Sequence, residues 1–208
     1  MLSANEAIQR LQEGNVRFQM NVRGIDAFLS QARREELKNN QEPFAIILGC
    51  ADSRVPAELV FDQGLGDLIL PAIAGNIVAP SGIGSVEFAA SRFGTRLVVV
   101  LGHSRCGAIL ASLEELRRPT ENQSRNLRSI VDRVRPSVEP LLAGATQGND
   151  ALVSAAVRAN IRASVNNLRR GSEILEQLVQ DGTLTIVGAE YSLETGVVDF
   201  YEGVPAAR

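Results

Sequence analysis

Two uninterrupted apolar runs of strand length constrain the fold of this chain more than any other feature. They are PFAIILGC at residues 43–50 and TRLVVVLG at residues 95–102. A strand without polar alternation is buried on both faces, and such strands are typical of parallel sheets covered by helices. Helical patterns at 82–94 and 106–118 flank the second run, so strand and helix alternate along the chain. We therefore predict an α/β fold with a central, mostly parallel β-sheet flanked by helices.

The rest of the chain adds further helices and strands around this centre. Apolar periodicity predicts helices at 3–19, 31–39, 124–142 and 150–180, the last broken at Gly171-Ser172. The apolar run at 66–75 contains Pro71, which indicates the end of a strand. The closing segment, 183–203, is predicted to form two strands around a turn.

The length of the chain fits a single domain. A chain of 208 residues is long enough for one substantial core and too short for two typical ones. We divide the domain, residues 1–208, into three segments by their predicted elements. These are an N-terminal helical arm at 1–40, an α/β core at 41–118, and C-terminal helices and edge strands at 119–208.

Charge and hydropathy exclude two classes of partner. The formal net charge is −3 and the arginines are scattered among acids, which is not the basic patch that nucleic-acid binding requires. No apolar stretch reaches the roughly 18–20 residues that span a bilayer. The N-terminal residues are polar and lack the apolar centre of a signal peptide. We expect a cytoplasmic protein without nucleic-acid or membrane partners.

The residues that bind soft metals all lie at the ends of predicted strands. His103 is the only histidine, and Cys50 and Cys106 are the only cysteines. Functional groups of parallel sheets gather beyond the carboxyl ends of the strands, where these three would meet. Two thiolates and one imidazole leave one position of a tetrahedral zinc ion open, as in catalytic sites. Taken singly, each would more often be an ordinary buried residue. Their conjunction predicts a zinc site.

An acidic and a basic residue follow Cys50 closely. Asp52 and Arg54 stand two and four residues after it, in CADSR. Asp52 is either a fourth metal ligand or a group that stands off and accepts a hydrogen bond from metal-bound hydroxide. Arg54 favours the second role, because pairing keeps the carboxylate ionised and holds it away from the metal. A surface salt bridge is the simpler alternative.

These motifs resemble the β-class carbonic anhydrases. CADSRVPAE at 50–58 and GHSRCGA at 102–108 carry the resemblance, which extends over nearly the whole chain. It implies one zinc ion per chain, bound by Cys50, His103 and Cys106. It also implies that Asp52 and Arg54 form a catalytic dyad, and that Gln41 lies in the substrate cleft. The family's unit is a dimer whose N-terminal helices embrace the partner, and dimers often pair into tetramers.

The resemblance implies the reversible hydration of carbon dioxide to bicarbonate and a proton. Zinc-bound hydroxide, oriented by the Asp-Arg dyad, would attack the substrate. We expect carbon dioxide to wait in an apolar pocket, and our candidates for its walls are Ile69, Ala74 and Phe88. Two thiolates cancel the charge of zinc, so its water is less acidic than at a three-histidine site. We therefore expect activity to increase towards alkaline pH.

One segment departs from the family pattern. In GDLILPAIAGN at 66–76, Ile69 stands where a phenylalanine is expected and Ala72 where an arginine is expected. Some members use that arginine with a tryptophan in a pocket where bicarbonate inhibits. The chain has no tryptophan, so we expect this pocket to be lacking. The departure leaves two alternatives open: a hydrolase of carbonyl sulfide or carbon disulfide, and a zinc-binding structural homologue.

Overall fold

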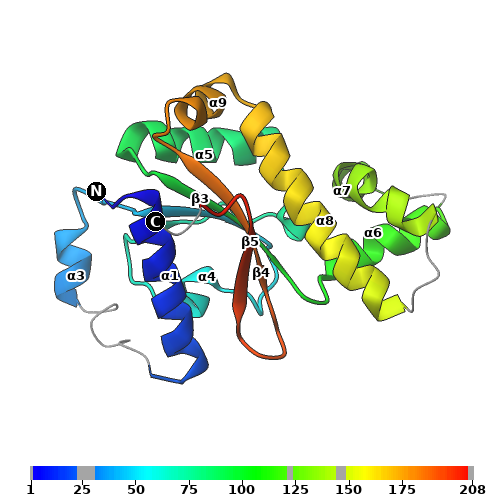
Figure 1. Ribbon diagram of the computed structural model, residues 1–208, viewed down its shortest axis with the longest axis horizontal. Coiled ribbons are helices and arrows are strands. Elements are labelled where there is room, and N and C mark those ends of the chain that lie inside the picture. The colour runs from blue at the N-terminus through cyan, green and yellow to red at the C-terminus, as the bar shows by residue number, and fades with distance from the viewer. Residues whose placement is uncertain (1, 23–30, 121–123, 144–148, 206–208) are drawn as a thin grey trace.

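The computed structural model describes residues 2–22, 31–120, 124–143 and 149–205, and its centre is a five-stranded sheet. The strands stand in the order β2-β1-β3-β4-β5 (Figure 1). The first four are parallel, and β5 is antiparallel to β4. Their bounds are β1 Ala45–Gly49, β2 Leu68–Ile69, β3 Leu97–His103, β4 Thr185–Tyr191 and β5 Val198–Glu202. The predicted α/β class with a mostly parallel sheet is confirmed.

Helices cover both faces of this sheet, as Figure 1 shows. One face packs against α1 and α4, and the opposite face packs against α5, α6, α7, α8 and α9. The helices that the structure describes are α1 Ala4–Gln19, α3 Gln31–Glu36, α4 Ala57–Val60, α5 Pro80–Phe93, α6 Gly107–Arg117, α7 Arg125–Ala143, α8 Asn149–Arg170 and α9 Glu173–Gln180, with a 3₁₀ turn, η1, at Ala74–Asn76.

The central strands are apolar throughout because both of their faces are buried. In β1, Ile46 and Leu48 belong to the core cluster beneath α5–α9, whereas Ala45 and Ile47 belong to the cluster beneath α1 and α4. All seven residues of β3 are buried. Successive side chains of a strand point to opposite faces, so an uninterrupted apolar run supplies both cores at once. This is the arrangement that the two runs predicted.

Local signals in the sequence set the ends of several helices. Ser3 caps α1 in a capping box with Glu6, as expected for a serine followed three residues later by an acid. Gly94 ends α5 with a φ of 66°, a conformation that glycine adopts without strain. The predicted break at Gly171-Ser172 separates α8 from α9, and Ser172 caps the second of these helices.

Helix α1 is held against its own chain by a buried amide. Asn15 is 3% exposed, and its Nδ2 donates to the carbonyls of Val60 at 3.1 Å and Gly196 at 2.8 Å. Its Oδ1 accepts from the N–H of Val198 at 2.9 Å. One side chain thus joins α1 to the end of α4 and to the β4–β5 turn. The packing of this segment on a partner subunit, and the division into three segments, stay predictions.

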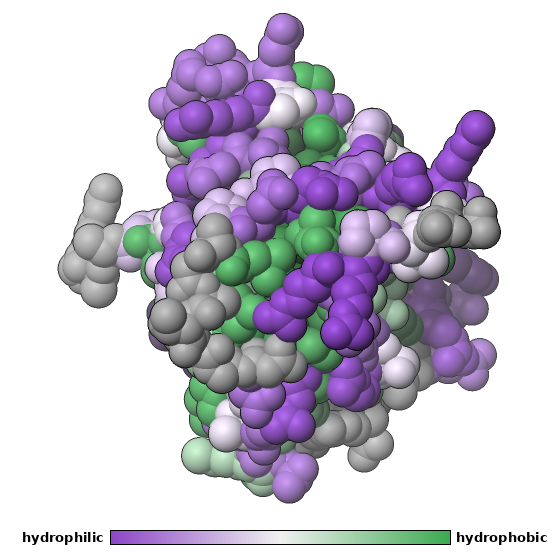
Figure 2. Space-filling view, turned by 90° about the vertical axis from the view of Figure 1, so that its right-hand side faces the viewer, coloured by the Kyte–Doolittle hydropathy of each residue, from purple (hydrophilic) through white to green (hydrophobic). Residues whose placement is uncertain are grey.

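The surface is mixed in character. Figure 2 shows the end of the molecule where α6, α7 and α8 lie, and apolar side chains are exposed there among hydrophilic ones. Leu127 of α7, for example, is 57% exposed. None of the described helices is both long and apolar enough to cross a membrane.

Gly14 allows α1 to approach the end of α4, and its replacement tests this contact. A Cβ atom at Gly14 would lie 1.8 Å from the carbonyl oxygen of Phe61, a backbone atom that cannot rotate away. We expect Gly14→Ala to lower the free energy of unfolding by about 2–3 kcal/mol. The matched control is Gly84→Ala in α5, where a Cβ would meet nothing within 4 Å.

The control substitution should stabilise the protein by about 0.5–1 kcal/mol, since alanine favours helix over glycine. Urea unfolding midpoints of the two variants and the wild type provide the comparison. Equal midpoints for both variants would contradict the close contact.

Candidate metal centre

The pairing of β1 with β3 brings two of the predicted ligands together. The strands are parallel neighbours, with Gly49 opposite Leu101 in register. Cys50 follows the last residue of β1, and His103 is the last residue of β3. Both side chains therefore leave the sheet at its carboxyl edge, where parallel α/β folds place their functional groups.

A tight turn returns the third ligand to the same place. Arg105 has a φ of 53°, a left-handed conformation that reverses the chain directly after Ser104. Cys106 then becomes the N-cap of α6. Its Sγ lies 3.9 Å from the Sγ of Cys50, and the ligand atoms of Cys50, His103 and Cys106 all lie within 4.8 Å of one another.

This geometry fits zinc. Tetrahedral zinc with Zn–S bonds of about 2.3 Å holds two sulfur ligands about 3.8 Å apart, close to the observed sulfur–sulfur distance. The imidazole is also oriented as a ligand, because its Nδ1–H donates to the carbonyl oxygen of Ser104 at 2.9 Å. Nε2 of His103 is fully buried and has no hydrogen-bond partner. Its lone pair is free to bind a metal.

The two thiols differ in acidity. The hydrogen bond with Cys106, the neighbouring His103 and the N–H of Gly75 lower the pKa of the Cys50 thiol well below its ordinary value. The same sulfur–sulfur hydrogen bond and burial raise the pKa of the Cys106 thiol. A dication at this point would lower the pKa of both thiols, because metals bind cysteine as the thiolate.

Asp52 and Arg54 form an ion pair beside these ligands. Arg54 donates from Nε to Oδ1 and from Nη2 to Oδ2 of Asp52, each at 2.8 Å, and its backbone N–H donates to Oδ1 at 3.0 Å. These bonds hold the pKa of the Asp52 carboxyl well below its usual range. Oδ2 of Asp52 lies 3.8 Å from Nε2 of His103. An ionised carboxylate thus stands next to the metal position.

A pocket of about 230 Å³ opens beside Cys50 and Asp52. Its walls come mainly from apolar side chains of β1, β3 and the segments after β1 and β2. They include Ile47, Val55, Leu70, Ala72 and Leu101, with Glu58 among the polar residues. Ala72, at the position where the family pattern has an arginine, leaves this wall apolar.

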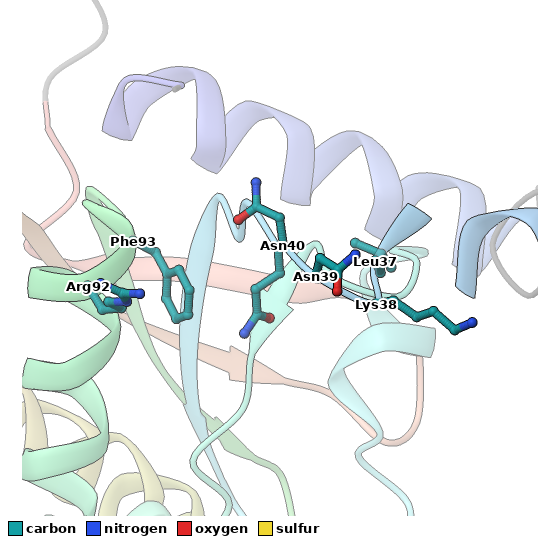
Figure 3. Close-up of a pocket in the computed structure, with 8 residues that line it drawn as sticks. Leu37, Lys38, Asn39, Asn40, Arg92 and Phe93 are labelled. Carbon is teal, nitrogen blue, oxygen red and sulfur yellow. The ribbon is translucent and has the colours of Figure 1, made fainter. Parts of the chain in front are cut away.

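Two of the predicted substrate-binding residues lie away from the pocket beside Cys50. Gln41 precedes β1 and lines a separate pocket of about 580 Å³ together with Asn40, Arg92 and Phe93 (Figure 3). Phe88 is 60% exposed, and its ring packs edge-on against Phe93 with centroids 5.7 Å apart. Neither residue lines the pocket beside Cys50. Their roles in substrate binding stay predictions.

The other two lie nearer the ligands. Ile69 packs against the core cluster beneath α5–α9, whereas its neighbour Leu70 lines the pocket. Ala74 begins η1, in which the N–H of Gly75 donates to Sγ of Cys50 at 3.3 Å. Leu70 and Ala72 were missed by the sequence analysis. Alternate side chains of an extended segment point to opposite sides. Leu70 and Ala72 therefore share one side, and Ile69 points to the other.

Comparisons with known proteins agree with one another. A family model described as "Carbonic anhydrase" matches residues 45–198. "Carbonic anhydrase 2" of Mycobacterium tuberculosis is 38% identical over 192 residues, which are 91% of this chain and 89% of that protein. The carbonic anhydrase of Mycolicibacterium smegmatis is also 38% identical, over 93% of this chain and 91% of its own length.

Solved structures give the class. The fold matches the β-carbonic anhydrase CcaA with a TM-score of 0.74 and 26% identity, over 97% of this chain and 93% of that one. A chain from the crystal structures of two tetrameric β-carbonic anhydrases of Sordaria macrospora has the same fold, with a TM-score of 0.72 and 20% identity over 88% of this chain and 92% of the matched one. The predicted resemblance, the enzyme class and the zinc cofactor are confirmed. The chain belongs to the β-class carbonic anhydrases.

Proposed function

We propose that Cys50, His103 and Cys106 hold the zinc ion of this carbonic anhydrase and that Asp52 orients the attacking water. The reaction is the reversible hydration of carbon dioxide to bicarbonate and a proton. The observation that carries the proposal is the cluster of three ligand atoms within 4.8 Å, with an ionised carboxylate beside it. Zinc, when bound, supplies Lewis-acid activation of water for attack on the substrate carbon.

Asp52 is suited to accept a hydrogen bond rather than to ligate the metal. Arg54 holds both carboxylate oxygens. An ionised carboxylate in this position accepts only. It thereby aims the lone pair of the attacking water towards carbon dioxide.

Replacing Asp52 by asparagine tests this role. The amide presents a donor where the water needs an acceptor, so we expect kcat to fall by about 10² or more while zinc content stays at that of the wild type. Stopped-flow hydration of carbon dioxide and a metal assay on the same sample measure both quantities. The control is Asp132→Asn, which removes an exposed carboxylate paired with Arg135 at 3.5 Å. Full turnover in Asp52→Asn would refute the role.

We assign the substrate to the apolar pocket beside these groups. Carbon dioxide is small, uncharged and weakly hydrated, so apolar walls suit it better than they suit bicarbonate. Ile47, Val55 and Leu70 provide such walls next to Asp52. Product bicarbonate, an anion, is disfavoured in the same pocket.

Filling the pocket should weaken substrate binding without disturbing the metal. Ala72 is an exposed residue on its wall, so we expect Ala72→Phe to narrow the pocket and to raise KM for carbon dioxide by about tenfold. The matched control is Ala111→Phe on the exposed side of α6. Initial rates over a range of substrate concentrations separate KM from kcat. An unchanged KM in Ala72→Phe would rule out this pocket.

The relatives also bear on the two alternatives. Proteins 38% identical over most of this chain are named carbonic anhydrases, and this favours hydration of carbon dioxide over hydrolysis of carbonyl sulfide or carbon disulfide. The intact ligand set and the acid–base pair favour an enzyme over a structural homologue. Cys50 and Cys106 are not joined in a disulfide, and thiolates kept for a metal suit a reducing compartment, which supports a cytoplasmic location.

We propose in addition that the working unit is a homodimer, or a dimer of dimers, in which Gln41 serves the partner's site. Gln41 precedes β1 and Cys50 follows it, so a five-residue strand about 16 Å long separates them. A role of Gln41 in the substrate cleft therefore requires a second copy of the chain. The tetrameric assembly named for the Sordaria macrospora enzymes supports oligomerisation.

A hybrid of two variants, each expected to lose most of its turnover on its own, tests this arrangement. Gln41→Ala and Asp52→Asn, carrying different tags, are expressed together, and the doubly tagged species is purified. One site of the hybrid then combines a native Asp52 with the native Gln41 of the other copy. We expect about half of the wild-type turnover per dimer. Turnover no higher than the mean of the two parents would show that Gln41 does not act across the interface.

A further inference from the structure

We propose that Asn160 and Ser164 of α8 are positioning residues for the Cys50 ligand. They hold the turn η1 so that the backbone N–H of Gly75 points at the sulfur atom of Cys50. The inference rests on the proposed role of Cys50 as a zinc ligand. It adds two residues, more than a hundred positions from Cys50 in the chain, to the groups that control the metal.

The contact with the sulfur atom comes from the backbone alone. The N–H of Gly75 donates to Sγ of Cys50 at 3.3 Å, and the contact is buried. Gly75 has a φ of 71°, and a Cβ atom there would lie 3.3 Å from Cβ of Ala108 at the start of α6. The turn is therefore pressed against α6 in a conformation that side chains rarely adopt. Such a turn needs support from its surroundings.

Helix α8 supplies that support through two buried side chains. Nδ2 of Asn160 donates to the carbonyl of Gly75 at 2.8 Å, and Oγ of Ser164 donates to the carbonyl of Asn76 at 3.0 Å. Asn160 and Ser164 are 2% and 3% exposed. They stand four residues apart and therefore lie on one face of the helix. Each satisfies a buried carbonyl and so fixes the plane of a peptide in η1.

The two sulfur atoms differ in their backbone donors. Cys106 is the N-cap of α6, and its side chain accepts no capping hydrogen bond from that helix. Cys50 instead depends on Gly75, which is 25 residues away in the chain. A donor to a thiolate withdraws charge from the sulfur and fixes its direction, which tunes the bond to a metal. The support from α8 therefore matters for Cys50.

Cobalt substitution tests the proposal through a signal that reports on the metal–sulfur bond. Zinc is exchanged for Co²⁺, and the thiolate-to-cobalt charge-transfer band is recorded for the wild type, Asn160→Leu, Ser164→Ala and Ser164→Thr. Losing the donor to Cys50 raises the energy of the sulfur electrons. We expect the band to move to longer wavelength in Asn160→Leu and Ser164→Ala, and to stay in place in Ser164→Thr, which keeps the hydroxyl.

Zinc release provides a second readout. Transfer of zinc from each holoenzyme to a chromophoric chelator should be about tenfold faster or more in Asn160→Leu and Ser164→Ala. The matched control is Asn15→Leu, which removes a buried asparagine with bonds of 3.1 Å and 2.8 Å to backbone carbonyls on the opposite side of the sheet. This control should lose stability and keep the wild-type band and release rate.

The outcomes distinguish failure of the thiolate ligands from failure of the positioning role. A wild-type cobalt protein without a charge-transfer band would overturn the proposed thiolate ligands themselves. A normal wild-type band with unchanged band and zinc release in the α8 variants would overturn only the positioning role. If Asn160→Leu fails to fold, Ser164→Ala, which deletes a single hydroxyl, decides the question.

Discussion

The parallel pairing of β1 with β3 is the constraint on which the rest of the site depends. Because Gly49 stands opposite Leu101, the two strands end side by side at the carboxyl edge of the sheet. Cys50 and His103 are then neighbours without any contribution from loops. A shift of the register by one residue would send alternate side chains to the wrong core and separate the ligands. The two apolar faces of these strands therefore protect the geometry of the metal site.

The other groups of the site differ in how far apart in the chain the residues are that place them. Asp52 and Arg54 find each other across two residues, and Cys106 caps the helix that follows it. The donor to Cys50 comes from a turn that α8 holds in place. The apolar pocket requires segments from β1, β3 and the stretch after β2 to meet. The acid–base pair and the position of Cys106 at the start of α6 thus rest on short-range contacts, whereas the donor to Cys50 and the pocket, like the pairing of β1 with β3, rest on long-range contacts.

Features with a local sequence signal were predicted, whereas features that depend on long-range contacts were missed. The strands at 43–50 and 95–102 and the ligand set were predictable, since burial on both faces and soft ligands at strand ends are strong local signals. The walls of the pocket were harder, because Pro71 interrupts the run at 66–75. The prediction chose Ile69, whereas Leu70 and Ala72 line the pocket. Gln41 lines a separate pocket with Phe93, a proximity that no spacing in the chain indicates, and Phe88 packs on Phe93 within α5.

The sequence by itself determined the fold class, the three candidate ligands and the Asp52–Arg54 pair, because each depends on patterns a few residues long or on the scarcity of histidine and cysteine. The family, and with it the reaction, could be read from the same motifs. The tertiary structure alone decided which face of each segment meets the pocket, and that Asn160 and Ser164 support the turn beside Cys50. These contacts join residues 85 and 88 positions apart. Only the packing of α8 across the sheet brings such residues together.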